Sequence, residues 1–344
     1  MLAAAVVAAL VSGVAGATAT HSANAKRTSG WIEALAMDGP RAAYDVGARG
    51  GPSGCNRLFV WNVLTGSSAR VSGKGTCNAD STSTGAGVRE LAVAGTRVAW
   101  IVNLGGNTES NDYLYTASLR RPKERVLAAA VRRGDVDGIL QGSWLGGLVG
   151  SDDLLAVNSR STDSKDAVSG ASLRVIAPSG LTTIATGQAA TLARSADLGR
   201  VAVLRPDGTV GTYTTSGALL RAVVPAPAKE VALRKDYLVV LTKARALEIY
   251  NANTGAFIRK WPVPAGAEHL DVHSGIAVYS LGRQVRALRL ATGTDVVLTT
   301  ARRAIEDVEI EAPGVIYAFN TVKGTKDIGN VAFVPLSRVI AAVS

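Results

Sequence analysis

Aromatic residues, cysteines and histidines are all scarce in this chain of 344 residues. Aromatic residues make up 5% of the sequence, and there are two cysteines and three histidines. Two thiols with no histidine near them argue against a zinc site. Apolar residues nevertheless make up 47% of the sequence, and Val, Ile, Leu and Ala supply most of them. The chain therefore has ample material for a core, and its composition excludes global disorder.

The motifs of several enzyme classes are missing. There is no G-x-S-x-G elbow, no phosphate-binding glycine loop and no Cys–His pair placed for nucleophilic catalysis. His269 and His273 share a strand face with Asp271, so the helical spacing of a zinc protease does not apply to them. The stretch 135–138 resembles the start of a calcium loop but lacks the later ligands. These absences favour a protein that is not an enzyme.

Negative charge is in deficit, because the net charge is +10 and the pI is about 9.8. A basic surface favours anionic partners. The basic residues are nevertheless scattered in pairs, such as Arg120-Arg121 and Arg132-Arg133, with no run of five. No basic helix or nucleic-acid module accompanies them, so we do not expect a nucleic-acid partner.

The N-terminal stretch 1–25 reads as an export signal. An apolar segment is followed by two A-x-A cleavage patterns, Ala17-Thr18-Ala19 and Ala23-Asn24-Ala25. A positive n-region is missing, so the true start could lie upstream, and no cysteine follows that could accept a lipid. A retained membrane anchor is the alternative, but the stretch falls short of the roughly 20 strongly apolar residues that a span needs. We expect a bacterial protein that is secreted or associated with the cell envelope, with no membrane span in the mature chain.

The two cysteines, Cys55 and Cys77, lie at equal distances from Gly66. Gly66 stands in the turn of a predicted hairpin, so the two residues face each other across its open end. In an exported protein this arrangement predicts a disulfide. Two independent free thiols are the alternative.

A repeat with a nearly constant period runs through the chain. The dipeptides Ser179-Gly180, Ser216-Gly217, Thr254-Gly255 and Thr292-Gly293 occupy equivalent turns, and their glycines are 37, 38 and 38 residues apart. A fixed period in the range of roughly 20–50 residues indicates a repeat architecture. A strand–turn–strand pattern occurs seven times, beginning near residues 32, 89, 143, 190, 230, 269 and 307.

Seven such units with no long helical period predict an all-β fold, a seven-bladed β-propeller of four-stranded antiparallel blades over residues 31–344. No unit can bury both faces of its sheet, so each must pack against two neighbours. The seventh unit contains four predicted strands through Val343, and we therefore expect no strand exchange between the termini, unless residues near Ser29-Gly30 add to the last blade. An open stack, or a six-bladed ring with one broken unit, is the alternative.

The repeat resembles the WD40-like, TolB-like and quinoprotein-like propeller families from about Trp31 onward. Trp61 is followed by Asn62 where a WD40 blade has Asp, and no Gly-His pair opens the blades. The kelch pattern and the tryptophan docking motif of pyrroloquinoline-quinone enzymes are also missing, so the resemblance carries no cofactor. It implies a fold that serves both enzymes and binding scaffolds.

The connections between the second and third strands differ among the units. They are short in the fourth to sixth units and long and polar at 47–56, 103–112, 159–170 and 320–329, which belong to units that adjoin in a closed ring. Connections of this length tend to be functional or disordered, although surface insertions are also tolerated at little cost. The mixed charges on these segments favour a protein, peptide or glycan partner, and the candidate binding residues are Arg49, Arg57, Asn103, Asn107, Glu109, Asp112, Arg160, Asp163, Lys323 and Lys326.

A second candidate site lies at the start of the inner strands. Glu90, Glu230, His269 and Asp307 occupy equivalent positions when the units are aligned, and they could converge at the mouth of the central channel. Such oxygen ligands suit Ca²⁺ or Mn²⁺, and a histidine adds affinity for softer divalent cations. A water-filled channel with solvated acids is the alternative.

These observations predict an exported, monomeric, non-catalytic propeller that binds a partner through one face. The alternative is a metal-dependent, lactonase-like hydrolase or lyase with its site at the acidic channel mouth.

Overall fold

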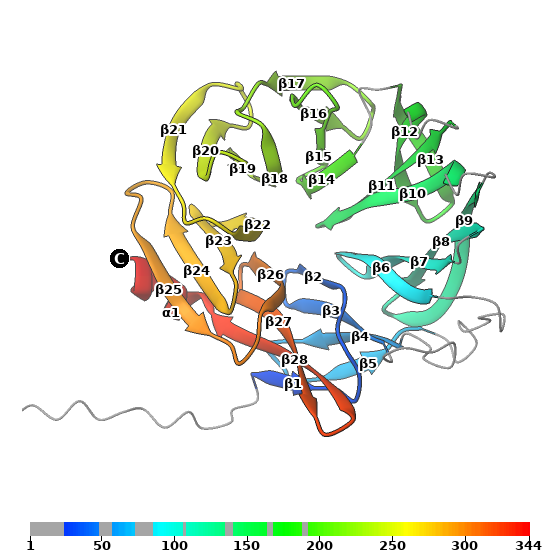
Figure 1. Ribbon diagram of the computed structural model, residues 1–344. Coiled ribbons are helices and arrows are strands. Elements are labelled where there is room, and N and C mark those ends of the chain that lie inside the picture. The colour runs from blue at the N-terminus through cyan, green and yellow to red at the C-terminus, as the bar shows by residue number, and fades with distance from the viewer. Residues whose placement is uncertain are drawn as a thin grey trace, which may run out of the picture.

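The computed structural model describes residues 24–47, 57–72, 85–105, 108–134, 140–163, 168–187 and 192–344. Its sheets stand radially around a central axis (Figure 1). Five sheets have four strands, and a sixth has eight strands that divide into two consecutive sets of four. The predicted all-β propeller architecture is confirmed. Cys55 and Cys77, and most of the predicted export signal, lie outside the described residues, so the disulfide and the signal stay predictions.

The innermost strand of each unit faces the axis. These strands are β2 (Leu35–Asp38), β6 (Gly85–Ala94), β10 (Leu140–Ser151), β14 (Leu192–Asp197), β18 (Ala228–Arg234), β22 (Ala267–His273) and β26 (Ile305–Glu311). Each inner strand contacts the inner strand of the next unit, and β26 contacts β2. Counted by inner strand, the ring therefore has seven units.

The remaining strands follow outward in chain order. The second strands are β3 (Arg41–Val46), β7 (Arg97–Gly105), β11 (Leu154–Thr162), β15 (Arg200–Leu204), β19 (Tyr237–Thr242), β23 (Ile276–Leu281) and β27 (Gly314–Lys323). The third strands are β4 (Arg57–Asn62), β8 (Glu109–Ser118), β12 (Val168–Ala177), β16 (Val210–Thr214), β20 (Ala246–Asn251), β24 (Gln284–Arg289) and β28 (Lys326–Pro335). The outer strands are β5 (Ser68–Arg70), β9 (Arg121–Gly134), β13 (Gly180–Thr186), β17 (Leu219–Val223), β21 (Phe257–Pro262), β25 (Asp295–Thr300) and β1 (Ala25–Arg27).

The core of the described chain consists of seven separate apolar clusters, and each lies between two neighbouring units. One of them joins the last unit to the first, where Ile316 and Phe333 pack with Leu35 and Trp61. A four-stranded sheet buries both faces only when it has a neighbour on each side. The seven clusters therefore confirm that packing between units, rather than within a unit, holds the ring.

The repeated Thr/Ser-Gly dipeptides lie in the turns between third and outer strands, as the repeat predicts. Gly217, Gly255 and Gly293 adopt φ values of 86°, 73° and 76°. Side chains other than glycine rarely occupy this region, which explains why the turn keeps glycine at this position.

The ring closes by a strand from the N-terminus, and the expectation of no strand exchange was wrong. β1 pairs antiparallel with β28, with Ala25 opposite Ala332 and Arg27 opposite Asn330. The last unit therefore takes its outer strand from the start of the chain, and the sheet begins before Trp31. Residues that we assigned to its fourth strand form the helix α1 (Leu336–Val343) instead. Val339 and Val343 are buried one helical turn apart, which fits a helix packed on one face.

The segment that follows β1 makes close contacts with both the last and the first units. The backbone N–H of Thr28 donates to Gly329 O at 2.9 Å. A Cβ atom on Gly30 would lie 1.9 Å from Gly47 O, so only glycine fits there. The side-chain amide of Asn320 both donates to Ile32 O at 2.8 Å and accepts from Ile32 N at 2.9 Å. These contacts fasten the first unit to the last.

Three predicted loops are extended hairpins rather than loops. Asn103 pairs with Asp112 across β7 and β8, and Lys323 pairs with Lys326 at the end of β27 and β28. β11 and β12 extend in the same way. A fourth hairpin, β9–β10, joins the second and third units into the eight-stranded sheet. Their polar residues lie on a sheet extension, some exposed and some buried, such as Asp112. In sequence such an extension looks like a loop because the apolar alternation is lost. No helix in the described chain has the length and apolar character to cross a membrane.

Candidate functional site

Six of the seven inner strands carry a β-bulge near the same level of the channel. The pairing register shifts between Val88 and Glu90, between Ala193 and Ser195, and between Ala228 and Glu230, and β10, β22 and β26 shift in the same way. A bulge places one extra residue on the strand and redirects its side chain. The extra residues on β6, β14 and β18 are Arg89, Arg194 and Lys229, and all three line the channel.

The channel is a polar cavity of about 500 Å³. Its acids are spread around the ring, since Glu90 on β6 and Glu230 on β18 line it too, but its basic residues are confined to part of the ring. Basic side chains come from β6, β14 and β18, whereas the wall formed by β26 and the segment before β2 is acidic, with Asp307, Glu309 and Glu33. The mouth can therefore attract a ligand or side chain that carries both charges.

Carboxylates also fasten each inner strand to the next one. At all seven junctions, a carboxylate in or directly after one inner strand accepts a hydrogen bond from a backbone N–H of the following unit. The pairs are Asp38 with Gly95, Glu90 with Leu148, Asp152 with Leu198, Asp197 with Lys235, Glu230 with Leu270, Asp271 with Ile310, and Glu309 with Met37. The inward edge of an inner strand has no strand partner, so its N–H groups need other acceptors.

The four predicted metal ligands all line this channel. Glu90 and Glu230 are engaged with backbone N–H groups at 2.7 and 2.5 Å, and His269 Nδ1 lies 3.6 Å from Asp307 Oδ1. Over the described ranges no three His, Cys, Asp or Glu side chains are grouped as a metal centre requires. Two of the proposed ligands thus have a structural role, and a divalent cation at the mouth stays a prediction for a melting experiment with Ca²⁺ or Mn²⁺.

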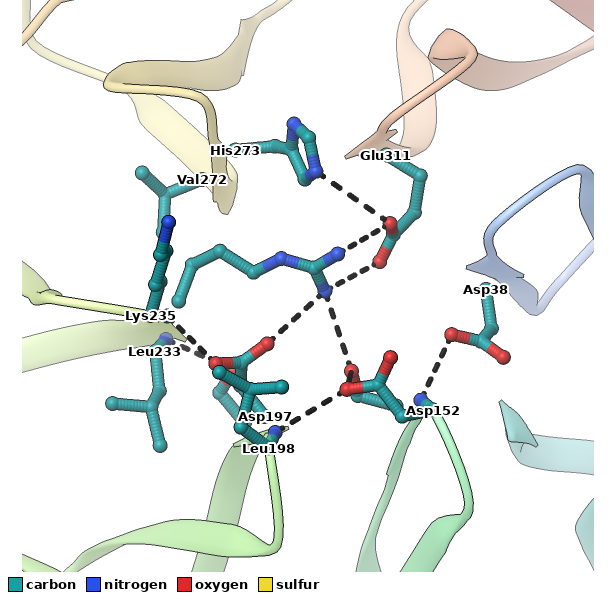
Figure 2. Close-up of polar contacts among 12 residues, drawn as sticks. Asp38, Asp152, Asp197, Leu198, Leu233, Lys235, Val272, His273 and Glu311 are labelled. Carbon is teal, nitrogen blue, oxygen red and sulfur yellow. Dashed lines mark hydrogen bonds and ion pairs between the residues drawn. The ribbon is translucent and has the colours of Figure 1, made fainter. Parts of the chain in front are cut away.

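The far end of the channel holds a cluster of charged side chains that sequence analysis did not reveal. Arg234 Nη1 and Nη2 donate to the two carboxylate oxygens of Glu311 at 2.7 and 2.6 Å. The same guanidinium lies 3.3 Å from Asp197 Oδ1 and donates to Ser151 Oγ at 3.3 Å. Figure 2 shows side chains from several inner strands converging here, including Asp38, Asp197 and Glu311. Arg234 therefore faces several buried acids, and Arg200, 3.4 Å from Asp197 Oδ2, is a second cation beside one of them.

This excess of buried acid shifts several ionisations. Burial raises the pKa of Glu311 to about 8, although Arg234 opposes the shift. Burial also raises the pKa of Asp271 and of Asp307 to about 6. Burial lowers the pKa of His273 to about 4, so that imidazole is neutral at pH 7. The acids along the channel are thus partly neutralised by protons rather than by counter-charges.

These shifts predict that the protein loses stability as the pH rises from 5 to 8. An acid with a raised pKa binds its proton more tightly when folded, so its contribution is present below the unfolded pKa and lost through the folded pKa. Glu311, Asp271 and Asp307 all act in this sense. His273 acts in the opposite sense, because its contribution is gained as the pH rises from about 4 to 6.5. The three acids outweigh one imidazole, and the melting temperature measured across this pH range should fall.

Glu311→Gln should flatten that profile between pH 6 and 8, because the amide does not titrate. Glu306→Gln is the matched control, since Glu306 is exposed on the same strand. A Glu311→Gln profile as steep as that of the wild type would show that another group governs the pH dependence.

The structure brings some predicted binding residues together inside the molecule. Asp112 is buried and accepts hydrogen bonds from Asn103 Nδ2 at 2.7 Å and Leu145 N at 3.0 Å. Its other neighbour is Arg89, at 3.5 Å. Arg160 stacks on Trp144, with the guanidinium carbon 3.3 Å from the ring centroid. Asn103 and Asp112 thus stabilise the base of the β7–β8 hairpin rather than forming its exposed tip.

Other predicted binding residues lie on the surface. Glu109 is exposed and forms an ion pair with Arg133 at 3.5 Å, and Asp163 is exposed directly after β11. Arg57 is half-buried and donates to Ser29 Oγ at 3.2 Å. Lys323 and Lys326 form the end of the β27–β28 hairpin. Arg49 and Asn107 lie outside the described residues.

Arg234 was missed because the units were aligned only at the start of their inner strands. An alignment of the units at the last residue of each inner strand reveals Arg234. The last residues of the seven inner strands are Asp38, Ala94, Ser151, Asp197, Arg234, His273 and Glu311. A single arginine among three acids at equivalent positions of a ring is the signal that could have located this cluster.

Comparison with known proteins shows the fold alone. Neither a family model nor a curated protein matches the sequence. A chain in a crystal structure of the mitotic checkpoint complex aligns with a TM-score of 0.56 and 12% identity, over 96% of this chain and 98% of that chain. The computationally designed protein Ika8 aligns with a TM-score of 0.50 and 15% identity, over 90% and 98%. Sqt1 of Saccharomyces cerevisiae has a TM-score of 0.49 and 10% identity, over 89% and 96%. The predicted resemblance to propeller proteins is confirmed at the level of the fold, and the chain is a β-propeller.

Proposed function

We propose that this chain is an exported, non-catalytic scaffold that binds a protein or peptide on the face where the channel opens. A glycan is the alternative partner. The observation that carries the proposal is the set of hairpins β7–β8, β9–β10 and β11–β12, which extend from two neighbouring units on that one face. On the same face the fourth to sixth units have only short connections between their second and third strands.

The hairpins are suited to present side chains in fixed positions. Each is a paired antiparallel ladder, and internal contacts such as Asp112 with Asn103 hold its base. Binding residues on a rigid support lose less conformational entropy when a partner docks. Exposed groups of both signs, such as Glu109 and Arg133, favour a partner with complementary charges.

The channel mouth adds a second contact region beside the hairpins. Arg194 projects into the cavity and is influenced by the charges of Glu90 and Glu230. An exposed loop or chain end of the partner could place an acidic group against Arg194. A scaffold needs only such a surface, whereas the hydrolase alternative would need the predicted metal.

Site-specific photocrosslinking tests the proposal. A photoreactive amino acid at Glu109 or Asp163 should give covalent adducts with a discrete partner in cell-envelope preparations, because both positions are exposed near hairpin ends. Asn103 and Asp112 are left intact so that the hairpin keeps its base. Mass spectrometry then identifies the adduct.

Lys243 and Asp236 are the matched control positions. Lys243 lies on the same face, in the short connection between β19 and β20. Asp236 lies in the turn between β18 and β19, on the opposite face. We expect no discrete adduct from either. Equal adducts from all four positions, or adducts from the controls alone, would contradict binding by the hairpin face.

A further inference from the structure

We propose that the crevice between β1 and the β27–β28 hairpin binds a phosphate group. It is a separate site from the proposed partner surface of the second and third units, and the inference does not depend on the scaffold function. A cavity of about 560 Å³ opens here. Its walls come from the two ends of the chain, namely Arg27 to Gly30 on one side and Lys323 to Ile328 on the other.

Three exposed cations line this crevice: Arg27, Lys323 and Lys326. Within the described part of the chain, none of these three side chains makes a hydrogen bond or ion pair. Asp327 is the one acidic side chain among the lining residues. The crevice thus has an excess of positive charge, and a dianionic group is the ligand that this excess fits best.

The two lysines lie directly opposite each other. Lys323 pairs with Lys326 as the last pair of the β27–β28 ladder. Like charges at directly opposed positions of an antiparallel pair destabilise the hairpin. An anion between the two ammonium groups removes this repulsion and gains two charge-assisted contacts.

Hydroxyl and guanidinium groups complete the site. Thr28 and Ser29 line the crevice, and Ser29 Oγ accepts a hydrogen bond from Arg57 Nη2 at 3.2 Å. The Ser29 hydroxyl hydrogen is therefore available to a ligand oxygen, and Arg57 adds a fourth positive charge at the rim. Arg57, Lys323 and Lys326 were predicted from sequence as binding residues on separate loops, and the structure gathers them around β1.

A bound phosphate would also bridge the strand that closes the ring. Arg27 and Thr28 come from the N-terminal segment, whereas the lysines come from the hairpin that this segment pairs with. A ligand that contacts both sides binds only while β1 is docked. Phosphate should therefore slow the opening of β1, by linkage of binding to docking.

Isothermal titration of the full chain with inorganic phosphate at low salt tests the site, with hydrogen exchange of residues 24–30 as a second readout. At phosphate ten times above the dissociation constant, we expect about tenfold slower exchange in that segment. Flotation with vesicles of phosphatidylcholine with or without phosphatidic acid separates a free phosphate from a lipid phosphomonoester. Binding to phosphatidic acid vesicles alone would assign the headgroup as the source, and binding of inorganic phosphate would assign the free group.

Lys326→Glu is the decisive variant. It converts the opposed lysines into an ion pair, so the hairpin should be at least as stable as in the wild type while phosphate affinity falls by about tenfold or more. Arg303→Glu is the matched control, because Arg303 is exposed elsewhere and its replacement changes the net charge equally. Equal losses in the two variants would reduce the effect to net charge and overturn the site. Absence of binding to both phosphate and phosphatidic acid would overturn it as well.

Discussion

Replacing Arg234 with methionine should lower the free energy of unfolding by about 3–5 kcal/mol, the range found when one partner of a buried ion pair is removed. The guanidinium is the cation that meets Glu311 and Asp197, both of which are buried. Methionine keeps much of the side-chain volume but leaves Glu311 without its guanidinium partner, and leaves Asp197 with Arg200 alone, 3.4 Å away. Urea unfolding at pH 7 measures the loss.

The stability lost in Arg234→Met should depend on pH and on the charge of Glu311. Because the pKa of Glu311 is about 8, acidification from pH 9 protonates this carboxylate, so the difference between Arg234→Met and the wild type should shrink as the pH falls from 9 toward 5. Adding Glu311→Gln to the variant should recover part of the lost stability. Arg302→Met, at an exposed position, is the control. If Arg234→Met unfolds no more easily than Arg302→Met, the cluster does not hold the far end of the ring.

Removal of β1 should have an effect of similar size. A chain that starts at Trp31 loses the pairing of Ala25–Arg27 with β28, the bond from Thr28 N to Gly329 O and the bond from Lys26 Nζ to Gly66 O. At about 1 kcal/mol for each hydrogen bond, the loss amounts to roughly 4–6 kcal/mol. The outer edge of β28 also becomes free to pair with another molecule.

A chain that starts at Asn24 is the matched control, because it keeps β1. Urea unfolding and light scattering should show a less stable and self-associating protein only for the chain that starts at Trp31. Equal stability of the two chains would mean that the contacts of Asn320 and the apolar cluster between the first and last units suffice to close the ring.

The inner and second strands could be predicted because their signal is local. Runs such as Val201–Leu204 and Leu238–Leu241 are apolar and β-branched, lie beside a turn, and are buried at inter-unit contacts. The nearly constant spacing of the Thr/Ser-Gly turns added a second, independent signal. Fold and unit number therefore followed from short-range patterns that each unit repeats.

Ring closure could not be predicted for the opposite reason. β1 is three residues long, Ala25-Lys26-Arg27, and has no apolar pattern of its own. Its pairing depends on backbone groups of β28, more than 300 residues away, which no local pattern encodes. The helix α1 was misassigned because Val339 and Val343 fit a strand or a helix equally well until their burial is known.

The candidate site could be predicted in part. Aligned inner strands placed Glu90, Glu230, His269 and Asp307 on the channel wall, where the structure has them. Sequence position did not show that Glu90 and Glu230 bind backbone N–H groups of the next unit. A carboxylate that bonds a backbone N–H of the next unit cannot be told from a ligand-binding carboxylate by residue type. Only its distance to the neighbouring strand distinguishes the two roles.

The pairing of β1 with β28 also determines when the ring can close during synthesis and folding. The ring cannot close until the residues of β28 have been made and have reached the N-terminal strand, so a growing chain retains an open edge until then. Asn24 O and Ala25 take part in that closure. A leader cut after Ala25 would remove them, whereas a cut after Ala19 would leave β1 whole. Of the two predicted cleavage patterns, only the first would leave every residue of β1 in place.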